Sequence, residues 1–230
     1  ARLTFGSLSQ AMHREVNLGR LRRLSFFGLC FGKTSLANYV PAKGETMTKP
    51  DVNIDSIDVE VVGFFPFLFK DETLKVNLNL HRPVVALRQS LEPDNHFWDL
   101  GIPLTGADAT QRRDRIKRYL TNEIVRPGKI SLDSANVKLT PSGHFEFGHG
   151  RVTQELRGVR GCIDFDAMVV NASAEGLVSD DGGKIQASCF CDLDSLVAAE
   201  GITVHTNMRM SGLNSSAAAG FLNLPFRATE

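Results

Sequence analysis

The sequence predicts a protein built mainly of antiparallel β-sheet with a few short helices attached. Hydrophobic and polar residues alternate with a period of two in most segments, which is typical of strands with one apolar face. Turn-forming clusters rich in Gly, Pro, Asp and Ser, such as 141–143 and 180–183, separate these segments. Segments with helical periodicity are few. Together these observations favour an all-β-dominated architecture.

Composition and charge exclude several classes of protein. The 230 residues include 26 basic and 26 acidic side chains, and a net charge of zero is atypical of proteins held to nucleic acid by bulk electrostatics. Hydrophobic residues make up 42% and charged residues 23%, as in globular rather than disordered proteins. No apolar run approaches the roughly 18 to 20 residues that span a bilayer. The chain opens at Ala1 without a signal peptide, so we expect a piece of a longer protein.

Strand segments follow one another along the chain. The stretch 74–80 alternates without a fault, with Leu74, Val76, Leu78 and Leu80 on one side. The stretch 51–62 also alternates but slips by one residue at Ser56, which predicts a β-bulge. Further strands are expected at 129–132, 136–139, 162–171, 184–190 and 202–210. The Asp-Gly-Gly turn at 180–183 predicts a β-hairpin.

The stretch 108–125 is the strongest helical candidate. Ile116, Leu120 and Ile124 recur at i, i+4 and i+8 and form one apolar stripe. The rest of the helix is basic, with arginines at Arg112, Arg113, Arg115 and Arg118 and a lysine at Lys117. We expect the stripe to pack on the sheet and the arginines to face an acidic partner or lipid headgroups.

The aromatic residues are almost all phenylalanine, with 15 Phe against two Tyr and one Trp. The most apolar stretch, 61–69, holds four of them: Phe64, Phe65, Phe67 and Phe69. Pro66 disfavours a central strand, so this stretch predicts a strand end followed by a turn. Two interpretations remain open: a hydrophobic plug at the end of the sheet, or a lip that faces lipid or a partner protein.

No motif in the chain predicts an enzyme. The stretch 28–34 resembles a phosphate loop, but three rather than four residues separate its glycines, so nucleotide binding is not expected. The four cysteines form no CxxC pair, and the ligands of 144–149 do not share one strand face, so neither a metal nor another cofactor is predicted. No nucleophile elbow and no Ser/His/Asp set stands out.

Several short motifs occur in a definite order. They are Gly19–Ser25 (GRLRRLS), Leu29–Tyr39 (LCFGKTSLANY), the alternating strands up to 80, Arg82–Leu87 (RPVVAL) and Phe97–Pro103 (FWDLGIP). In this order they resemble the N-terminal segment of the AsmA/TamB-like family. The stretch 151–226, with VRG, DGGK and a final FLNLPF, is similar to a later TamB-type repeat. The tryptophan motif and the basic helix after it look most like the plastid members, giant inner-envelope translocon subunits with a TamB domain.

The resemblance implies an elongated antiparallel sheet curled into an apolar groove. It divides the chain into an N-terminal AsmA/TamB-like β-unit (1–105), a basic amphipathic helix or connector (106–126) and a second β-unit of TamB-type repeats (127–230). It also implies a place at the plastid (chloroplast) inner envelope membrane, facing the intermembrane space, with the anchor in a segment outside this chain. The expected groove or partner contacts are Phe64, Phe65, Phe67, Phe69, Leu74, Val76, Leu78, Leu80, Arg112, Arg113 and Arg115.

The function implied by the resemblance is non-enzymatic. It is a structural bridge in protein import, which links the inner-membrane translocon to the outer-membrane channel of plastids. The expected partners are inner- and outer-envelope translocon subunits, with lipids as further candidates and no nucleic acid. The alternative is a lipid-transfer conduit that uses the same apolar groove. A third hypothesis is an ordinary compact β-domain.

Overall fold

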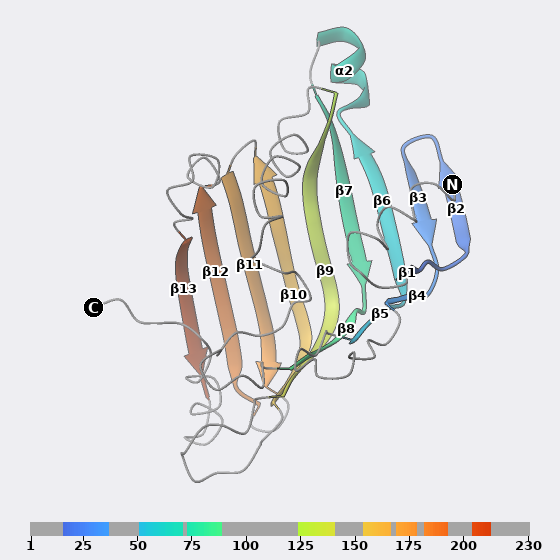
Figure 1. Ribbon diagram of the computed structural model, residues 1–230. Helices are drawn as coiled ribbons and strands as arrows, with labels where there is room; N and C mark the ends of the chain where they lie inside the picture. The colour runs from blue at the N-terminus through green and yellow to red at the C-terminus, as the bar shows by residue number, and fades with distance from the viewer. Residues whose placement is uncertain are drawn as a thin grey trace, which may run out of the picture.

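The structure is a computed structural model that describes residues 16–36, 51–70, 73–88, 124–140, 154–166, 169–178, 182–192 and 204–212. Within these ranges the chain forms one open, mixed sheet of 13 strands and one helix (Figure 1). The prediction of a mainly β architecture is therefore confirmed. The sheet is not purely antiparallel as expected, because it contains one parallel joint.

The elements before this joint are short. Six strands precede the helix: β1 (Val16–Asn17), β2 (Leu21–Ser25), β3 (Gly28–Phe31), β4 (Thr34–Leu36), β5 (Asp51–Ile54) and β6 (Ser56–Val62). The helix and two strands follow: α2 (Phe64–Lys70), β7 (Leu74–His81) and β8 (Val84–Arg88). The strands after the joint are longer: β9 (Val125–Thr140), β10 (Gln154–Asp166), β11 (Val169–Val178), β12 (Lys184–Asp192) and β13 (Val204–Ser211).

Strand β9 joins the two parts of the sheet. It runs parallel to both β7 and β8 on one side and antiparallel to β10 on the other. A parallel pair needs a crossover of a dozen or more residues, and residues 89–124 separate β8 from β9. From β10 to β13 the chain forms an antiparallel meander. The two β-units expected from the sequence therefore share one continuous sheet.

The strands change partners along one line across the sheet, which we call the crease. On one side of it β3, β6, β7 and the first half of β9 pair in order, and on the other side β4, β5, β8 and the second half of β9 do so. The crease passes through Gly32, Asp55, Arg82, Ser134 and Gly158. Arg82 and Ser134 have φ angles of 47° and 54°, in the left-handed region that non-glycine residues rarely adopt.

Two sequence predictions are corrected at the crease. The slip at Ser56 is not a bulge within one strand, because β5 and β6 end and begin on either side of Asp55 and pair with different strands. The segments 129–132 and 136–139 are not separate strands but two halves of β9, which continues through the left-handed residue Ser134. Both errors arise because a local kink and a strand end leave the same break in alternation.

The apolar stretch 61–69 does not end in a turn as expected. Strand β6 ends at Val62, Gly63 takes a φ of 84°, and helix α2 begins at Phe64. The Phe67 N–H donates to the Gly63 carbonyl at 2.8 Å, which closes the first helical turn. Pro66 fits this turn because the first N–H groups of a helix have no partner within it. The proline that excludes a central strand is thus compatible with a helix start.

Two further predictions differ from the structure in extent. The expected strand 162–171 is split between β10, which ends at Asp166, and β11, which begins at Val169. The expected helix 108–125 lies mostly outside the described residues, but its predicted end is wrong because Val125 is the first residue of β9. The predicted hairpin is confirmed: β11 and β12 pair antiparallel, and the Val178 N–H donates to the Gly183 carbonyl at 2.8 Å.

A small hydrophobic core lies on the side of the crease away from α2. Leu139, Val178 and Ile185 are buried there, and partly buried residues of β8, β9, β10 and β13 pack against them: Leu87, Val137, Leu156 and Met210. The core therefore joins strands from both parts of the sheet. On the α2 side of the crease, the apolar residues of β6 and β7 are half-buried, except for Val62, which is exposed.

We expect Leu139→Ala to lower the free energy of unfolding by about 2 to 5 kcal/mol, because it leaves a cavity in this core. Leu177→Ala is the matched control, since Leu177 is 53% exposed on β11, whereas Leu139 is 9% exposed. Urea unfolding of both variants measures the difference. Equal losses of stability would show that the core is not where the structure places it.

Candidate functional site

One face of the sheet is apolar across nine strands, and we call it the apolar face. Strand pairing places side chains of neighbouring strands in rows that run across the sheet. One row consists of Leu24, Leu29, Val59, Leu78, Ile130, Ile163, Ala172, Cys189 and Thr206. The next consists of Leu21, Phe31, Ile57, Leu80, Leu132, Gly161, Ala174, Ala187 and Met208.

The predicted groove residues of β7 all lie on this apolar face. Val76 pairs with Val61 and Pro127, Leu78 with Val59 and Ile130, and Leu80 with Ile57 and Leu132. All four predicted residues, Leu74 included, are half-buried rather than fully covered. The structure therefore places them on one face of the sheet, beside apolar residues of β6 and β9.

Side-chain size changes along the apolar face. On β6, β7 and the first half of β9 the rows hold Ile, Val and Leu. On β10, β11 and β12 the same rows hold Ile163 and otherwise the small residues Gly161, Ala172, Ala174, Ala187 and Cys189. A Cβ at Gly161 would lie 2.7 Å from the Ser173 carbonyl oxygen, so this position is closed to larger residues.

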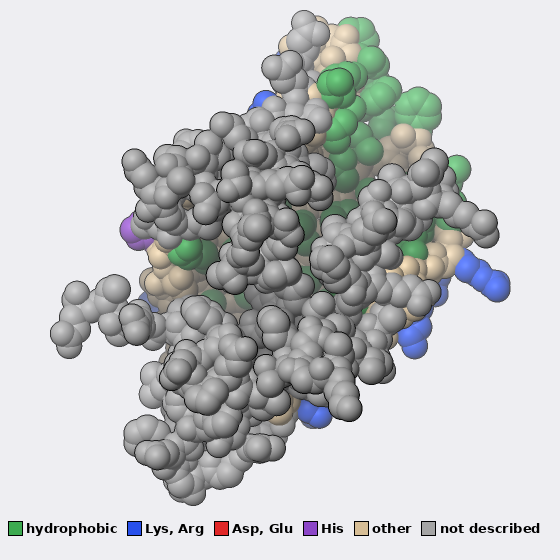
Figure 2. Space-filling view, in the orientation of Figure 1, with side chains coloured by type: hydrophobic (Ala, Val, Ile, Leu, Met, Phe, Trp, Pro, Cys, Tyr) green, Lys and Arg blue, Asp and Glu red, His purple; other side chains and the backbone are tan. Residues whose placement is uncertain are grey.

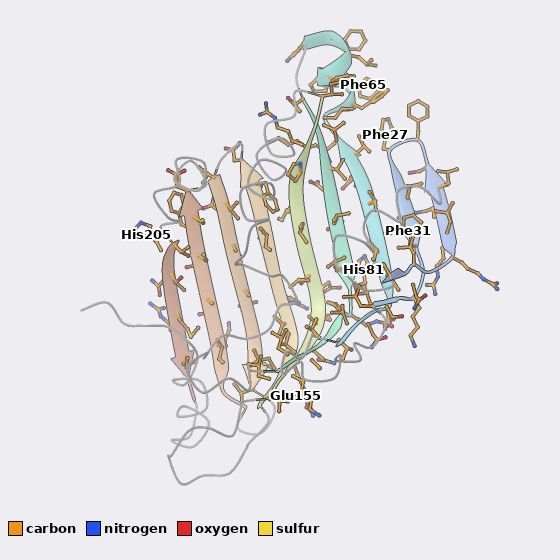
Figure 3. The ribbon with its side chains drawn as sticks, viewed as in Figure 1. Phe27, Phe31, Phe65, His81, Glu155 and His205 are labelled. Carbon is orange, nitrogen blue, oxygen red and sulfur yellow. The ribbon has the colours of Figure 1, made fainter. Side chains whose placement is uncertain are left out.

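A cluster of exposed phenylalanines, which we call the aromatic tip, lies at the α2 end of the sheet. It consists of Phe26 and Phe27 in the β2–β3 turn together with Phe64, Phe65, Leu68 and Phe69 of α2. Figure 3 shows Phe27 and Phe65 at this end, on the hairpin and the helix respectively. Four pairs of rings pack edge to face, with centroids 5.3 to 5.9 Å apart. Two of these pairs join the β2–β3 turn to α2, and the other two each lie within one of these elements.

Exposure at the aromatic tip discriminates between the two interpretations of the phenylalanine stretch. Phe26 is 82% exposed and Phe69 is 80% exposed, while Phe65 is 62% exposed. No residue of α2 is buried. Figure 2 shows these hydrophobic side chains gathered at the α2 end of the molecule. The outer side of the helix is therefore exposed, as the lip interpretation requires, while its own residues Phe64 and Phe67 are half-buried.

The opposite face of the sheet is polar. One of its rows consists of Arg23, Cys30, Asp58, Asn79, Ser131, Cys162, Ser173, Ser188 and Asn207. A shallow hollow of about 530 Å³ lies on it over β10 to β13, lined mainly by hydroxyl, thiol and amide groups with Phe190 and His205 at one side. The rings of Phe190 and His205 have centroids 6.1 Å apart. These groups could hydrogen-bond a polar ligand but share no reactive arrangement.

The densest charge cluster on the polar face lies at the crease. His81 is held between two carboxylates, with Nε2 2.9 Å from Asp58 Oδ2 and Nδ1 3.8 Å from Asp133 Oδ2. Arg23 lies 3.6 Å from Asp58 Oδ1, and Arg160 lies 3.9 Å from Asp133 Oδ1. The cluster connects side chains of β2, β6, β7, β9 and β10 across the sheet. Figure 3 shows the position of His81 within the sheet.

The electrostatics of this cluster do not favour nucleophilic catalysis. Hydrogen bonding from the Cys30 thiol, and then from the His81 ring, holds the pKa of Asp58 below its ordinary value despite partial burial. The same contact with Asp58, together with desolvation, raises the pKa of Cys30. A reactive cysteine needs the opposite shift, because the thiolate is the nucleophile. We therefore interpret Cys30, Asp58 and His81 as structural.

Some predicted site residues cannot be placed. Arg112, Arg113 and Arg115 lie outside the described residues, as does the tryptophan motif at 97–103. Sequence reasoning missed Phe26 and Phe27, although two adjacent phenylalanines between alternating runs were a signal for an exposed hairpin turn. In the described ranges, no three His, Cys, Asp or Glu side chains are grouped to hold a metal ion. Within the same ranges, no helix has the length and hydrophobicity to span a membrane.

Comparison with known proteins adds no further information on the family. No family model matches the chain, and no curated protein matches it. The resemblance to the AsmA/TamB-like family therefore stays a prediction from the sequence motifs.

The lowered pKa of Asp58 predicts that the stability of the protein depends on pH. Its folded pKa is depressed, so its contribution is present above the unfolded pKa of about 3.9 and is lost as the pH falls through the folded value. We expect Asp58→Asn to lower the melting temperature at neutral pH and to flatten its fall at acid pH. Asp166→Asn, an exposed carboxylate at the end of β10, serves as control. An unchanged acid limb in Asp58→Asn would contradict this assignment.

Proposed function

We propose that this chain is a section of a non-enzymatic β-sheet bridge in the plastid envelope. In this proposal it lies in the intermembrane space, is anchored in the inner envelope membrane through a segment outside this chain, and links the inner-membrane protein-import translocon to the outer-membrane channel. The observation that carries the proposal is the open sheet, whose side-chain rows run without interruption across nine strands. The family resemblance supplies the location and the partners.

The edge of the sheet at β13 supports this proposal. In the described part of the chain β13 pairs only with β12, so its outer edge can accept another strand (Figure 1). The strand has eight residues and contains no proline that would block pairing. A sheet that grows by adding strands lengthens across its strands and can become a long, narrow structure. A bridge between two membranes needs such growth.

A lipid-transfer conduit is the second candidate, and the apolar face favours it. Its rows run across the strands, in the direction in which the sheet would grow, and they hold half-buried aliphatic side chains on β6, β7 and β9. On β10 to β12 the same rows hold mostly small side chains together with Ile163. Apolar surface of this extent normally needs a cover, and a lipid is one.

The bridge proposal predicts that the protein contacts subunits of both envelope membranes. We expect chemical crosslinking in intact plastids, followed by purification through a tag on the full-length protein, to recover translocon subunits of both the inner and the outer envelope. Crosslinking after the two membranes have been separated is the control, and it should retain only the inner-envelope subunits. Recovery of subunits from a single membrane in intact plastids would rule out a bridge, and recovery of none would rule out the location.

The conduit proposal predicts bound lipid that depends on the apolar face. We expect Val76→Asp to lower lipid occupancy in native mass spectrometry, because a carboxylate among aliphatic side chains is costly to desolvate. Asn77→Asp is the matched control: it adds the same charge on the adjacent residue of β7, on the polar face, and keeps an acceptor for the Lys129 N–H. If both variants carry the same amount of lipid as the parent chain, the apolar face is not a lipid path.

A further inference from the structure

His81 lies at the point of the crease where the strands change partners. It is the last residue of β7, and the residue after it, Arg82, is left-handed. Across the parallel joint its partner is Asp133, which directly precedes the second left-handed residue, Ser134. His81 and Asp133 are therefore the last pair of β7 and β9 before β9 takes β8 as its partner.

The ring of His81 lies between carboxylates of the two strands that flank β7. Its Nε2 lies 2.9 Å from Asp58 Oδ2 on β6, and its Nδ1 lies 3.8 Å from Asp133 Oδ2 on β9. The charged ring has an N–H on each nitrogen, whereas the neutral ring has one N–H and one bare nitrogen. A neutral ring can therefore donate to one carboxylate only and turns a lone pair toward the other. The link from β6 to β9 through this ring consequently depends on one proton.

The other charged or titratable groups of this cluster keep their charge between pH 5 and 8. The described groups that face His81 or its two carboxylates are Arg23 on β2, Cys30 on β3, Asp58 on β6, Asp133 on β9 and Arg160 on β10, with the pair of Arg82 and Asp55 beside them. Arginine stays charged over this range, and carboxyl groups ordinarily titrate near pH 4. The contact with Asp58 raises the pKa of the Cys30 thiol, which therefore stays neutral. Among the described residues of the cluster, His81 is thus the group whose charge changes.

Two backbone hydrogen bonds lie directly beside the His81 ring. The Asp55 N–H donates to the His81 carbonyl at 3.2 Å, and the Arg82 N–H donates to the Asp133 carbonyl at 2.8 Å. Asp133 thus meets β7 twice, through its side chain at His81 and through its backbone at Arg82. Since the left-handed conformation of Arg82 is unfavourable by itself, it depends on such contacts. The Arg82 amide is therefore a local probe of the contact between His81 and Asp133.

We propose that His81 is a proton-dependent clasp of the crease. The charged ring joins β6 to β9, and loss of one proton releases Asp133, which is the more distant and the more exposed of the two carboxylates. The contribution of the clasp is present at about pH 5.5 and is lost as the pH rises through the range in which histidine gives up its proton. This dependence is opposite in sign to that of Asp58, whose contribution is lost at acid pH. The clasp does not depend on the bridge or the conduit.

Hydrogen exchange of single amides, followed by NMR on this chain, tests the clasp. We use the protection factor, which is corrected for the intrinsic effect of pH on exchange. For the Arg82 amide it should fall about two- to fivefold from pH 5.5 to pH 8, the factor that corresponds to an exposed ion pair. The Val178 amide is the internal control, because it donates to the Gly183 carbonyl in the hairpin of β11 and β12, away from the crease. Its protection factor should not change.

Two variants identify the groups responsible. His81→Gln keeps a side-chain donor but cannot become charged, so the protection factor of the Arg82 amide should be independent of pH and equal to that of the parent chain at pH 8. Asp133→Asn should remove the same pH dependence with His81 intact. The asparagine keeps an oxygen that can accept from the Ser134 hydroxyl, which donates to Asp133 Oδ1 at 3.1 Å.

A histidine elsewhere in the sheet provides the matched control. His205 is exposed on β13, away from the crease, so His205→Gln should keep the pH dependence of the parent chain. A protection factor of the Arg82 amide that is the same at both pH values in the parent chain would overturn the proposal. An equal fall at Val178 would do so too, because the whole sheet and not the crease would then respond. A pH dependence that persists in His81→Gln would assign the effect to another group.

Discussion

The crease is the constraint on which the rest of the structure depends. At this line the backbone must turn in β7–β8 and in β9 at residues that accept a left-handed conformation, Arg82 and Ser134. Such residues cost roughly 1 to 2 kcal/mol each, so surrounding contacts must offset the cost. Here the Arg82 N–H donates to the Asp133 carbonyl at 2.8 Å, and the Arg82 guanidinium lies 2.9 Å from Asp55. At the crease three strand pairs thus give way to three others, and backbone hydrogen bonds and ion pairs bridge the change.

The crease also explains why the buried core and the candidate binding surface occupy different parts of one sheet. Beyond it, β8 and the second half of β9 pack with β10 to β13 around Val178, which is 1% exposed. Before it, the apolar residues of β6 and β7 are half-buried, except for the exposed Val62. The hydrophobic core of the described residues therefore lies beyond the crease and not beneath β6 and β7.

The sequence was sufficient to predict features that depend on local alternation. The faultless pattern of β7, the hairpin between β11 and β12 and the mainly β architecture all follow from residues near in sequence. It did not predict the crease, because a break in alternation at Asp55 does not reveal that the next strand takes new partners. The parallel joint between β7 and β9 depends on contacts across residues 82–124, which no local pattern encodes.

In the candidate site, too, the sequence predicts what depends on local alternation and misses what depends on contacts between distant residues. The residues of β7 could be assigned to one face because strand periodicity alone determines their side. The aromatic tip could not be assembled from the sequence, since it requires Phe27 and Phe64, 37 positions apart, to meet with centroids 5.7 Å apart. Helix α2 was mistaken for a turn because Pro66 was weighed only against a strand, and not as a residue of a first helical turn. Strand periodicity therefore predicted the apolar face of β7 but not the aromatic tip at the end of the sheet.

The width of the sheet is too small for either candidate function unless further strands are added. The rows of the apolar face cross nine strands, and strands lie about 4.8 Å apart, so each row is roughly 38 Å long. That length exceeds an extended acyl chain but is only comparable with the thickness of one bilayer. A bridge or conduit between two membranes therefore needs further strands on the β13 edge, added in register so that the apolar rows continue. Because a shift of one residue would move every side chain to the other face, a conduit demands strict register at that edge. A purely mechanical bridge needs only the backbone hydrogen bonds between strands, whatever their register. A requirement for one fixed register at β13 therefore distinguishes a lipid conduit from a mechanical bridge.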